Sequence, residues 1–157
     1  MKLHLFWYEC KNCKKIFKSP ELCGDGYGEC LFLDECGNMA YLNSFSDMVF
    51  NEVSVIFDKV VLEEKFKNID YLFPDVLRMV CDRSPSNKIY SLRKPLCSIC
   101  KKSNFSHFGP TNPPEIIEMD IPNATHNTWN KLSIEEKKQC VSEAIKVALD
   151  NENLSAS

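Results

Sequence analysis

The sequence predicts an α+β fold. Three patterns support this expectation: two Cys-x-x-Cys motifs separated by 83 residues, strand-like runs around a turn at 35–38, and apolar residues at helical spacing. The 157 residues are 44% hydrophobic, which is enough for a hydrophobic core. We therefore expect a single domain over 1–150, followed by a frayed tail at 151–157.

The first part of the chain is predicted to be mostly β-structure. Residues 3–9 form a strand that leads into the first cysteine motif, and 16–17 begin the strand that returns from it. Glycines and a Ser-Pro pair predict turns over 19–28. The runs 29–34 and 39–43 then form a hairpin.

Residues 47–62 fit two patterns, and the helical one is longer. Valine, phenylalanine and isoleucine recur there at three-and-four spacing, which places them on one helical face, and Ser46 or Asp47 can cap the helix. The competing period-two pattern, which favours a strand, covers only Val53, Val55 and Phe57. We therefore predict a helix over 47–62.

A second helix is predicted over 70–81, with Pro74 in its first turn. Residues 88–92 then form a strand that leads into the second cysteine motif, and a proline-rich extended segment follows that motif. The last helix begins with a capping box formed by Ser133 and Glu136. Its apolar face is predicted to contain Cys140, Val141, Ala144, Ile145 and Ala148.

The two cysteine motifs predict a metal site with four sulfur ligands, Cys10, Cys13, Cys97 and Cys100. Two residues between cysteines allow a tight turn to direct both sulfurs at one ion, about 2.3 Å away. Four protein ligands leave no open position for substrate, so the predicted role is structural and the predicted ion is Zn²⁺. Iron in the same tetrahedron, a redox pair at the first motif and free buried thiols remain alternatives.

The segments Tyr8–Phe17 and Leu96–Lys102 resemble the knuckles of the zinc ribbon, or rubredoxin-like, class of metal modules. The resemblance covers about 35 residues and implies the ligands and the local fold, but no activity. Lys14 and Lys101 stand where such knuckles usually have glycine. The predicted organisation is a split ribbon from 1–18 and 88–106, an insertion over 19–87, and a proline-rich segment and helix over 107–150.

The remaining cysteines and histidines give weaker signals. Cys23, Cys30 and Cys36 form a loose group that we interpret as structural, with a second metal site or a redox pair as alternatives. Cys81 and Cys140 are predicted to be small core residues. Of the three histidines, only His126 has a functional appearance, and a structural brace is the more common role for such a residue. His4 alternates in a strand, and His107 follows the second knuckle.

Charge is distributed unevenly, although the formal total is only -3. Segments 1–18 and 88–105 contain ten basic residues and one acid, Glu9, whereas the remainder is acidic. One interpretation is a basic face that binds nucleic acid, with aromatic residues available for stacking. The other is that the lysines offset thiolate charge. The basic residues are Lys2, Lys11, Lys14, Lys15, Lys18, Lys88, Arg93, Lys94, Lys101 and Lys102, and the aromatic ones are Phe6, Trp7, Tyr8, Phe17 and Phe105.

These patterns favour a non-enzymatic, zinc-stabilised protein-binding domain, such as an inhibitor or immunity protein that neutralises a basic toxin. A nucleic-acid-binding zinc ribbon that uses its lysine-rich face is the alternative. An enzyme using His126, Asp120, Glu115 or Glu118 has no supporting motif. Without a secretory signal or a run of about 18 apolar residues, nine cysteines indicate a reducing cytoplasm and no membrane partner.

Overall fold

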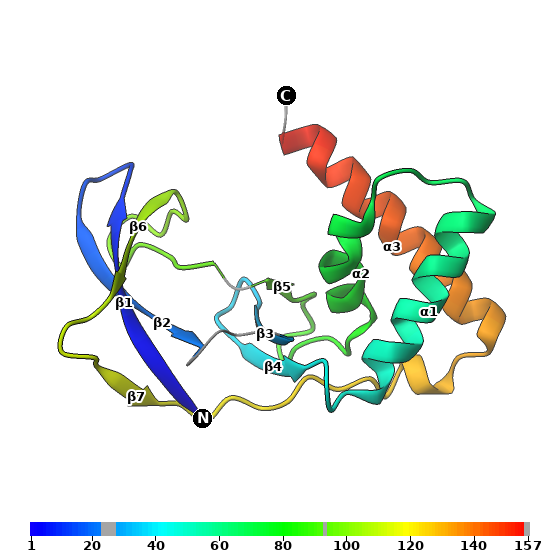
Figure 1. Ribbon diagram of the computed structural model, residues 1–157, viewed down its shortest axis with the longest axis horizontal. Helices are drawn as coiled ribbons and strands as arrows, with labels where there is room; N and C mark the ends of the chain where they lie inside the picture. Colours follow the sequence, from blue (N-terminus) through cyan, green and yellow to red (C-terminus); the bar gives the residue numbers. More distant parts are fainter. Residues whose placement is uncertain (23–27, 93, 156–157) are drawn as a thin grey trace. The chain divides into compact units, whose positions relative to one another are not determined.

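The computed structural model describes residues 1–22, 28–92 and 94–155, and the chain divides into two compact units (Figure 1). The first, here called the cysteine unit, combines Met1–Glu29 with Arg93–Pro122. The second, the helical unit, combines Cys30–Leu92 with Asn123–Ser157. The fold is α+β and ends in a helix, as predicted.

The cysteine unit contains an antiparallel sheet arranged around β1 (Lys2–Cys10). Strand β2 (Ile16–Leu22) pairs with it along its length, so both arms of the first knuckle are strands. Strand β6 (Phe105–Pro110) pairs with the C-terminal half of β1, and β7 (Ile116–Glu118) pairs with the N-terminal half. The sheet therefore connects the chain before the first knuckle with the chain after the second.

The core of this unit is small. Tyr8 stacks on Phe17 with ring centroids 5.6 Å apart, and Phe105 meets the Tyr8 ring edge-on at 4.9 Å. Tyr8 and Phe17 pack with two buried cysteines, Cys10 and Cys97, and these four residues form the core cluster of the unit. Two of the four predicted sulfur ligands are thus part of the apolar core.

The turn predicted over 19–28 is wrong for its first residues, because β2 continues through Leu22. Pro20 lies within the strand, opposite Leu5. Proline lacks a backbone N–H donor and is tolerated in edge strands, and β2 is at the edge of this sheet. Residues 23–27 lie outside the described part of the chain.

The helical unit contains a second sheet with strand order β4-β3-β5, formed by β3 (Glu29–Leu33), β4 (Met39–Asn43) and β5 (Ser91–Leu92). The hairpin predicted for the first two strands is confirmed, and the Asp34 N–H donates to the Asn38 carbonyl at 3.0 Å across its turn. The strand predicted over 88–92 is wrong in extent. Only its last two residues pair, with Phe32 and Leu33 of β3.

Three helices complete this unit: α1 (Met48–Glu63), α2 (Phe73–Val80) and α3 (Ile134–Ser155). Both α1 and α2 contact α3. Short 3₁₀ turns at Asp70–Leu72 (η1) and Trp129–Lys131 (η2) precede α2 and α3. The helical interpretation of 47–62 is therefore confirmed, and the predicted second helix divides into η1 and α2.

Side-chain caps determine where two helices begin. The Asp47 carboxylate accepts from the N–H groups of Val49 at 2.8 Å and Phe50 at 3.0 Å, so Asp47 is the cap of α1. The predicted capping box is also present. The Ser133 N–H donates to the Glu136 carboxylate at 2.7 Å, and the Glu136 N–H donates to the Ser133 hydroxyl at 3.3 Å.

The helical unit has the larger core, with nineteen buried apolar residues among those described. Trp129 is fully enclosed, and its indole N–H donates to Glu52 at 2.8 Å. The predicted apolar face of α3 is buried at every position except Cys140, which is half-buried. Among the described helices, none is long and apolar enough to cross a membrane.

Candidate metal centre

The four cysteines predicted as ligands lie together in the cysteine unit. Their Sγ atoms all lie within 4.8 Å of one another. Cys10 and Cys100 are 3.4 Å apart, and Cys13 and Cys97 are 3.5 Å apart. Each short pair joins one knuckle to the other, so the cluster holds together segments separated by 83 residues.

Both knuckles have the same backbone geometry. In the first, the Lys14 N–H donates to the Cys10 carbonyl at 2.8 Å. In the second, the Lys101 N–H donates to the Cys97 carbonyl at 3.0 Å. Lys14 and Lys101 adopt left-handed φ angles of 58° and 57°. The lysines therefore take the conformation for which glycine is favoured, and the missing glycine does not alter the turn.

Backbone N–H groups directed at the sulfurs separate the acidities of the four thiols. The N–H of Cys100 lowers the pKa of Cys97 to about 6, in spite of burial. The N–H of Lys15 lowers the pKa of Cys13, but burial and the neighbouring sulfurs outweigh it and raise that pKa to about 12. Four adjacent thiols therefore do not all ionise at neutral pH without a cation between them.

The donor set fits a tetrahedral metal ion. Zn²⁺–sulfur distances of about 2.3 Å place the sulfurs of a regular tetrahedron about 3.8 Å apart. The separations between the knuckles are within a few tenths of an ångström of that value. N–H groups directed at thiolates supply the outer hydrogen bonds that such sites require. The arrangement is compatible with a zinc-ribbon module.

Comparison with protein families, with curated proteins and with solved structures gives no match to this chain. The site is therefore interpreted from its own geometry.

The redox alternative for the first motif does not fit the local fold. A thioredoxin-type pair requires a helix directly after the motif, but Cys13 is followed by strand β2. Cys30 is half-buried against the helical core, and Cys36 is exposed in the turn between β3 and β4. Cys23 lies outside the described residues.

The residues predicted to form a basic face separate into two groups. Lys18 forms an ion pair with Glu115 and lies over the Trp7 ring, and Lys88 pairs with Glu35 in the helical unit. Arg93 lies outside the described residues. Five lysines of the knuckles are exposed, and among the described residues none of them forms an ion pair with a carboxylate. They are Lys11, Lys14, Lys15, Lys101 and Lys102.

His126 makes a contact of the kind expected of a structural brace. It is buried in the helical unit, and its Nε2 atom lies 2.9 Å from the Asp47 carboxylate that caps α1. This contact connects the segment before η2 to the start of α1. The second histidine named above, His4, lies in β1, and the acids Glu115 and Glu118 belong to the cysteine unit.

An exposed apolar stripe on α1 was not predicted. Met48, Val55 and Leu62 follow one another at intervals of seven residues, which is close to two helical turns. Their exposed fractions are 88%, 54% and 78%. The period-seven pattern is present in the sequence, but its residues are interspersed with the buried apolar positions that identify the helix, so it does not stand out.

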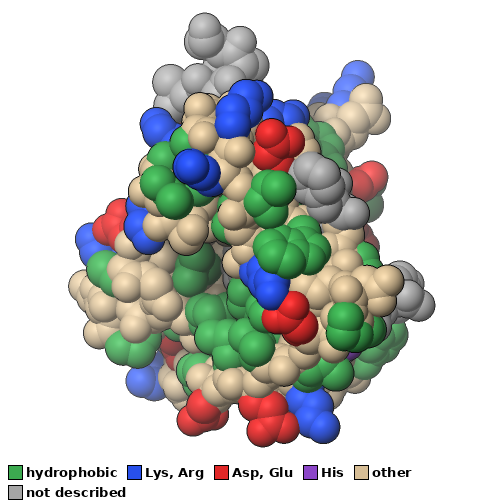
Figure 2. Space-filling model, turned by 90° about the vertical axis from the view of Figure 1, so that its left-hand side faces the viewer, with side chains coloured by type: hydrophobic (Ala, Val, Ile, Leu, Met, Phe, Trp, Pro, Cys, Tyr) green, Lys and Arg blue, Asp and Glu red, His purple; other side chains and the backbone are tan. Residues whose placement is uncertain are grey.

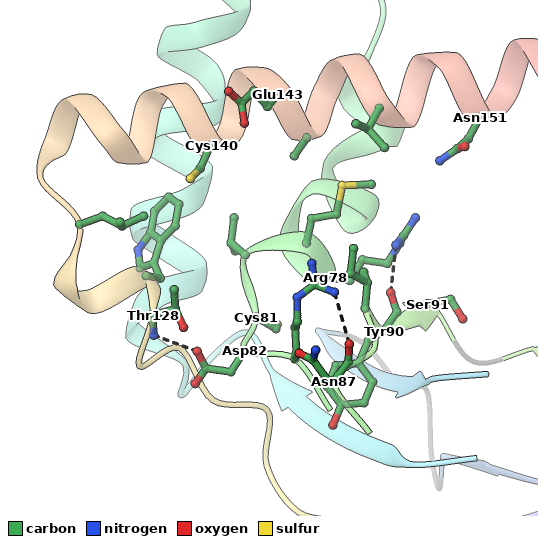
Figure 3. A pocket seen from close by; sticks show the side chains of 18 residues that line it. Arg78, Cys81, Asp82, Asn87, Tyr90, Ser91, Thr128, Cys140, Glu143 and Asn151 are labelled. Carbon is green, nitrogen blue, oxygen red and sulfur yellow. Dashed lines mark hydrogen bonds between the residues drawn. The ribbon is translucent and has the colours of Figure 1, made fainter. Parts of the chain in front are cut away.

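The helical unit also contains a pocket of about 720 Å³ between α2, α3 and β5 (Figure 3). Cys140 and Glu143 lie along its α3 side. Two of its polar groups already have partners within the helical unit: Arg78 donates to the Tyr90 carbonyl at 2.9 Å, and the Thr128 N–H donates to Asp82 at 2.8 Å. These bonds stabilise the packing, so we assign the pocket no ligand.

Proposed function

We propose that the protein is a non-enzymatic binding protein, stabilised by a structural Zn²⁺, that docks on another protein through α1. The α1 stripe carries this proposal. Large aliphatic side chains that are exposed on one side of a helix can mark an interaction surface, and here three of them recur at intervals of seven residues. The stripe lies away from the buried face of α1, so core packing does not account for it.

The metal has a structural role in this proposal. Four sulfur ligands complete the coordination of a tetrahedral ion, so no position remains for water or substrate. Zn²⁺ fits four thiolates in a tetrahedron, and a reducing cytoplasm keeps those thiolates available. Elemental analysis of purified protein tests this part, with one zinc ion per chain expected and iron as the alternative result.

Charge indicates the kind of partner. The helical unit contains fifteen acidic and ten basic residues, a formal charge of -5. A basic protein is therefore attracted to this unit, and complementary charge increases the rate of encounter and the selection of partners. A toxin neutralised by a bound inhibitor is a partner of this type.

Photocrosslinking in the native host tests the surface. Replacing Val55 by p-benzoyl-phenylalanine places a reactive group in the middle of the stripe. The matched control is the same replacement at Val147, which is 48% exposed on α3. We expect one basic protein to crosslink through position 55 and not through position 147.

The purified partner then allows a quantitative test. The double variant Val55→Ser, Leu62→Ser is expected to weaken binding at least tenfold, because it removes apolar contact area, whereas Val147→Ser leaves binding unchanged. Equal crosslinking at both positions, or recovery of nucleic acid alone, contradicts the proposed function.

A further inference from the structure

We infer that the exposed knuckles form a second binding surface, one that holds the phosphate backbone of a nucleic acid. This surface, here called the knuckle surface, belongs to the cysteine unit. It does not depend on the α1 stripe, so either proposal can fail alone. It is formed by Lys11, Lys14, Lys15, Lys94, Lys101 and Lys102.

The charge of the knuckle surface remains positive after the metal is counted. Segments 10–15 and 94–104 contain six lysines and no acid. A Zn²⁺ with four thiolates carries a formal charge of -2, which leaves +4 on these short segments. In Figure 2, Lys and Arg side chains gather at the upper end of the face shown. A concentrated positive surface of this kind attracts polyanions.

The cluster of sulfurs brings these lysines together from the two ends of the cysteine unit. Cys10 and Cys100 are 3.4 Å apart, and the Lys11 N–H donates to the Asn104 carbonyl at 2.9 Å. Every lysine of the surface is exposed, and within the described ranges none of them forms an ion pair with a carboxylate. Lys18, by contrast, is neutralised by Glu115. The ammonium groups are therefore available for an external anion.

The structure favours phosphate contacts over base stacking. Tyr8 and Phe17 are buried against each other, and Phe105 packs on Tyr8, so these three rings are not available to bases. Trp7 lies under the ammonium group of Lys18. Lysine also makes fewer base-specific contacts than arginine. Binding through this surface is therefore expected to be independent of sequence and strongly dependent on salt.

Two of the lysines can be removed without loss of stability. Lys14 and Lys101 have left-handed φ angles, so replacing each by glycine removes a charge and relieves backbone strain. Lys65 in the helical unit provides a matched control. It is exposed and has a φ of 58°, so Lys65→Gly makes the same chemical change away from the knuckles.

The experiment measures the binding of the zinc-loaded full chain to a fluorescent 20-base-pair DNA duplex. If four to six phosphates are contacted, the affinity is expected to fall about 10²–10³-fold between 50 and 200 mM salt. The variant with Lys14→Gly and Lys101→Gly is expected to bind at least about tenfold more weakly at 50 mM, with a salt slope smaller by about two. Lys65→Gly leaves both quantities unchanged.

Four results overturn the inference. The first is absence of duplex binding by the wild-type protein at 50 mM salt. The second is an equal loss of affinity in Lys65→Gly and in the knuckle variant. The third is tighter binding to vesicles containing phosphatidylserine than to DNA at equal phosphate concentration, which identifies a membrane as the partner. A change of duplex sequence that alters the affinity more than about tenfold contradicts the phosphate mode specifically.

Discussion

Removal of the metal is expected to unfold the cysteine unit and leave the helical unit folded. The two units differ in how much apolar surface supports them. Among the described residues, the cysteine unit has four buried side chains in its core cluster, and two of these are the predicted ligands Cys10 and Cys97. The helical unit has nineteen buried residues in its own core. Loss of the ion therefore removes a large part of the stability of one unit only.

The magnitude follows from these cores. Burial of Tyr8 and Phe17 contributes roughly 1.5–3 kcal/mol each, and a single core in a unit of 59 residues rarely supplies more than about 3–5 kcal/mol. Zn²⁺ bound by four thiolates contributes about 10–16 kcal/mol to the folding of small zinc domains. The metal term is the larger, so the cysteine unit is not expected to fold without it.

Hydrogen exchange read by mass spectrometry distinguishes the two units in one sample. After treatment with a strong chelator under reducing conditions, amides in β1, β2 and β6 are expected to exchange within seconds. Amides in α1 and α3 are expected to keep their protection. The variant Cys97→Ser should reproduce the chelated pattern, and Cys36→Ser, which changes an exposed cysteine outside the cluster, should not.

Protection of β1 and β2 that persists after elemental analysis shows the metal to be gone would refute this reasoning. The apolar core would then be sufficient to hold the knuckles together. Simultaneous unfolding of α3 would refute the separation of the units, because it would show that both cores depend on the ion.

Three further predictions concern single residues. Lys14→Gly should raise the free energy of unfolding of the zinc-loaded cysteine unit by about 0.5–1 kcal/mol, measured by chemical denaturation, because relief of the left-handed φ exceeds the entropy cost of glycine. Asp82→Ala should lower the stability of the helical unit by about 2–3 kcal/mol, since its carboxylate accepts from Thr125 and from the N–H groups of Asn127 and Thr128; an unchanged urea midpoint contradicts this. Burial raises the pKa of Asp34, but hydrogen bonds to its carboxylate outweigh burial and lower that pKa to about 2. The ionised Asp34 carboxylate therefore contributes fully to the stability of the fold above about pH 5, and this contribution is lost as the pH falls from about 4 towards 2. Asp34→Asn should remove this acid-dependent part of the stability, and urea midpoints at pH 6 and pH 3 compare the two proteins.

Local patterns were sufficient where neighbouring residues determine structure. The capping box identified the start of α3, the three-and-four spacing identified α1, and the turn at 35–38 identified the hairpin of β3 and β4. In each case the pattern that identifies the element lies within a short stretch of sequence, so it can be read without knowing the tertiary structure. The four sulfur ligands were predicted for the same reason, because each pair belongs to one tight turn.

Long-range pairing could not be read from the chain. The segment 88–92 has the composition of a strand, but only its last two residues find a partner, in β3. Pro20 appears as a turn residue, yet its position at a sheet edge makes it compatible with β2. The partner strand decides both cases, and no local pattern identifies that partner.

The sequence by itself determined most of the helices and strands, the four candidate ligand cysteines and the excess of lysine around them. Only the tertiary structure decided that Lys18 and Lys88 are neutralised while the knuckle lysines remain available, and that an apolar stripe of α1 is left uncovered. The physical reason is that charge and apolarity belong to single residues. Pairing and burial depend on which distant residues the fold brings into contact.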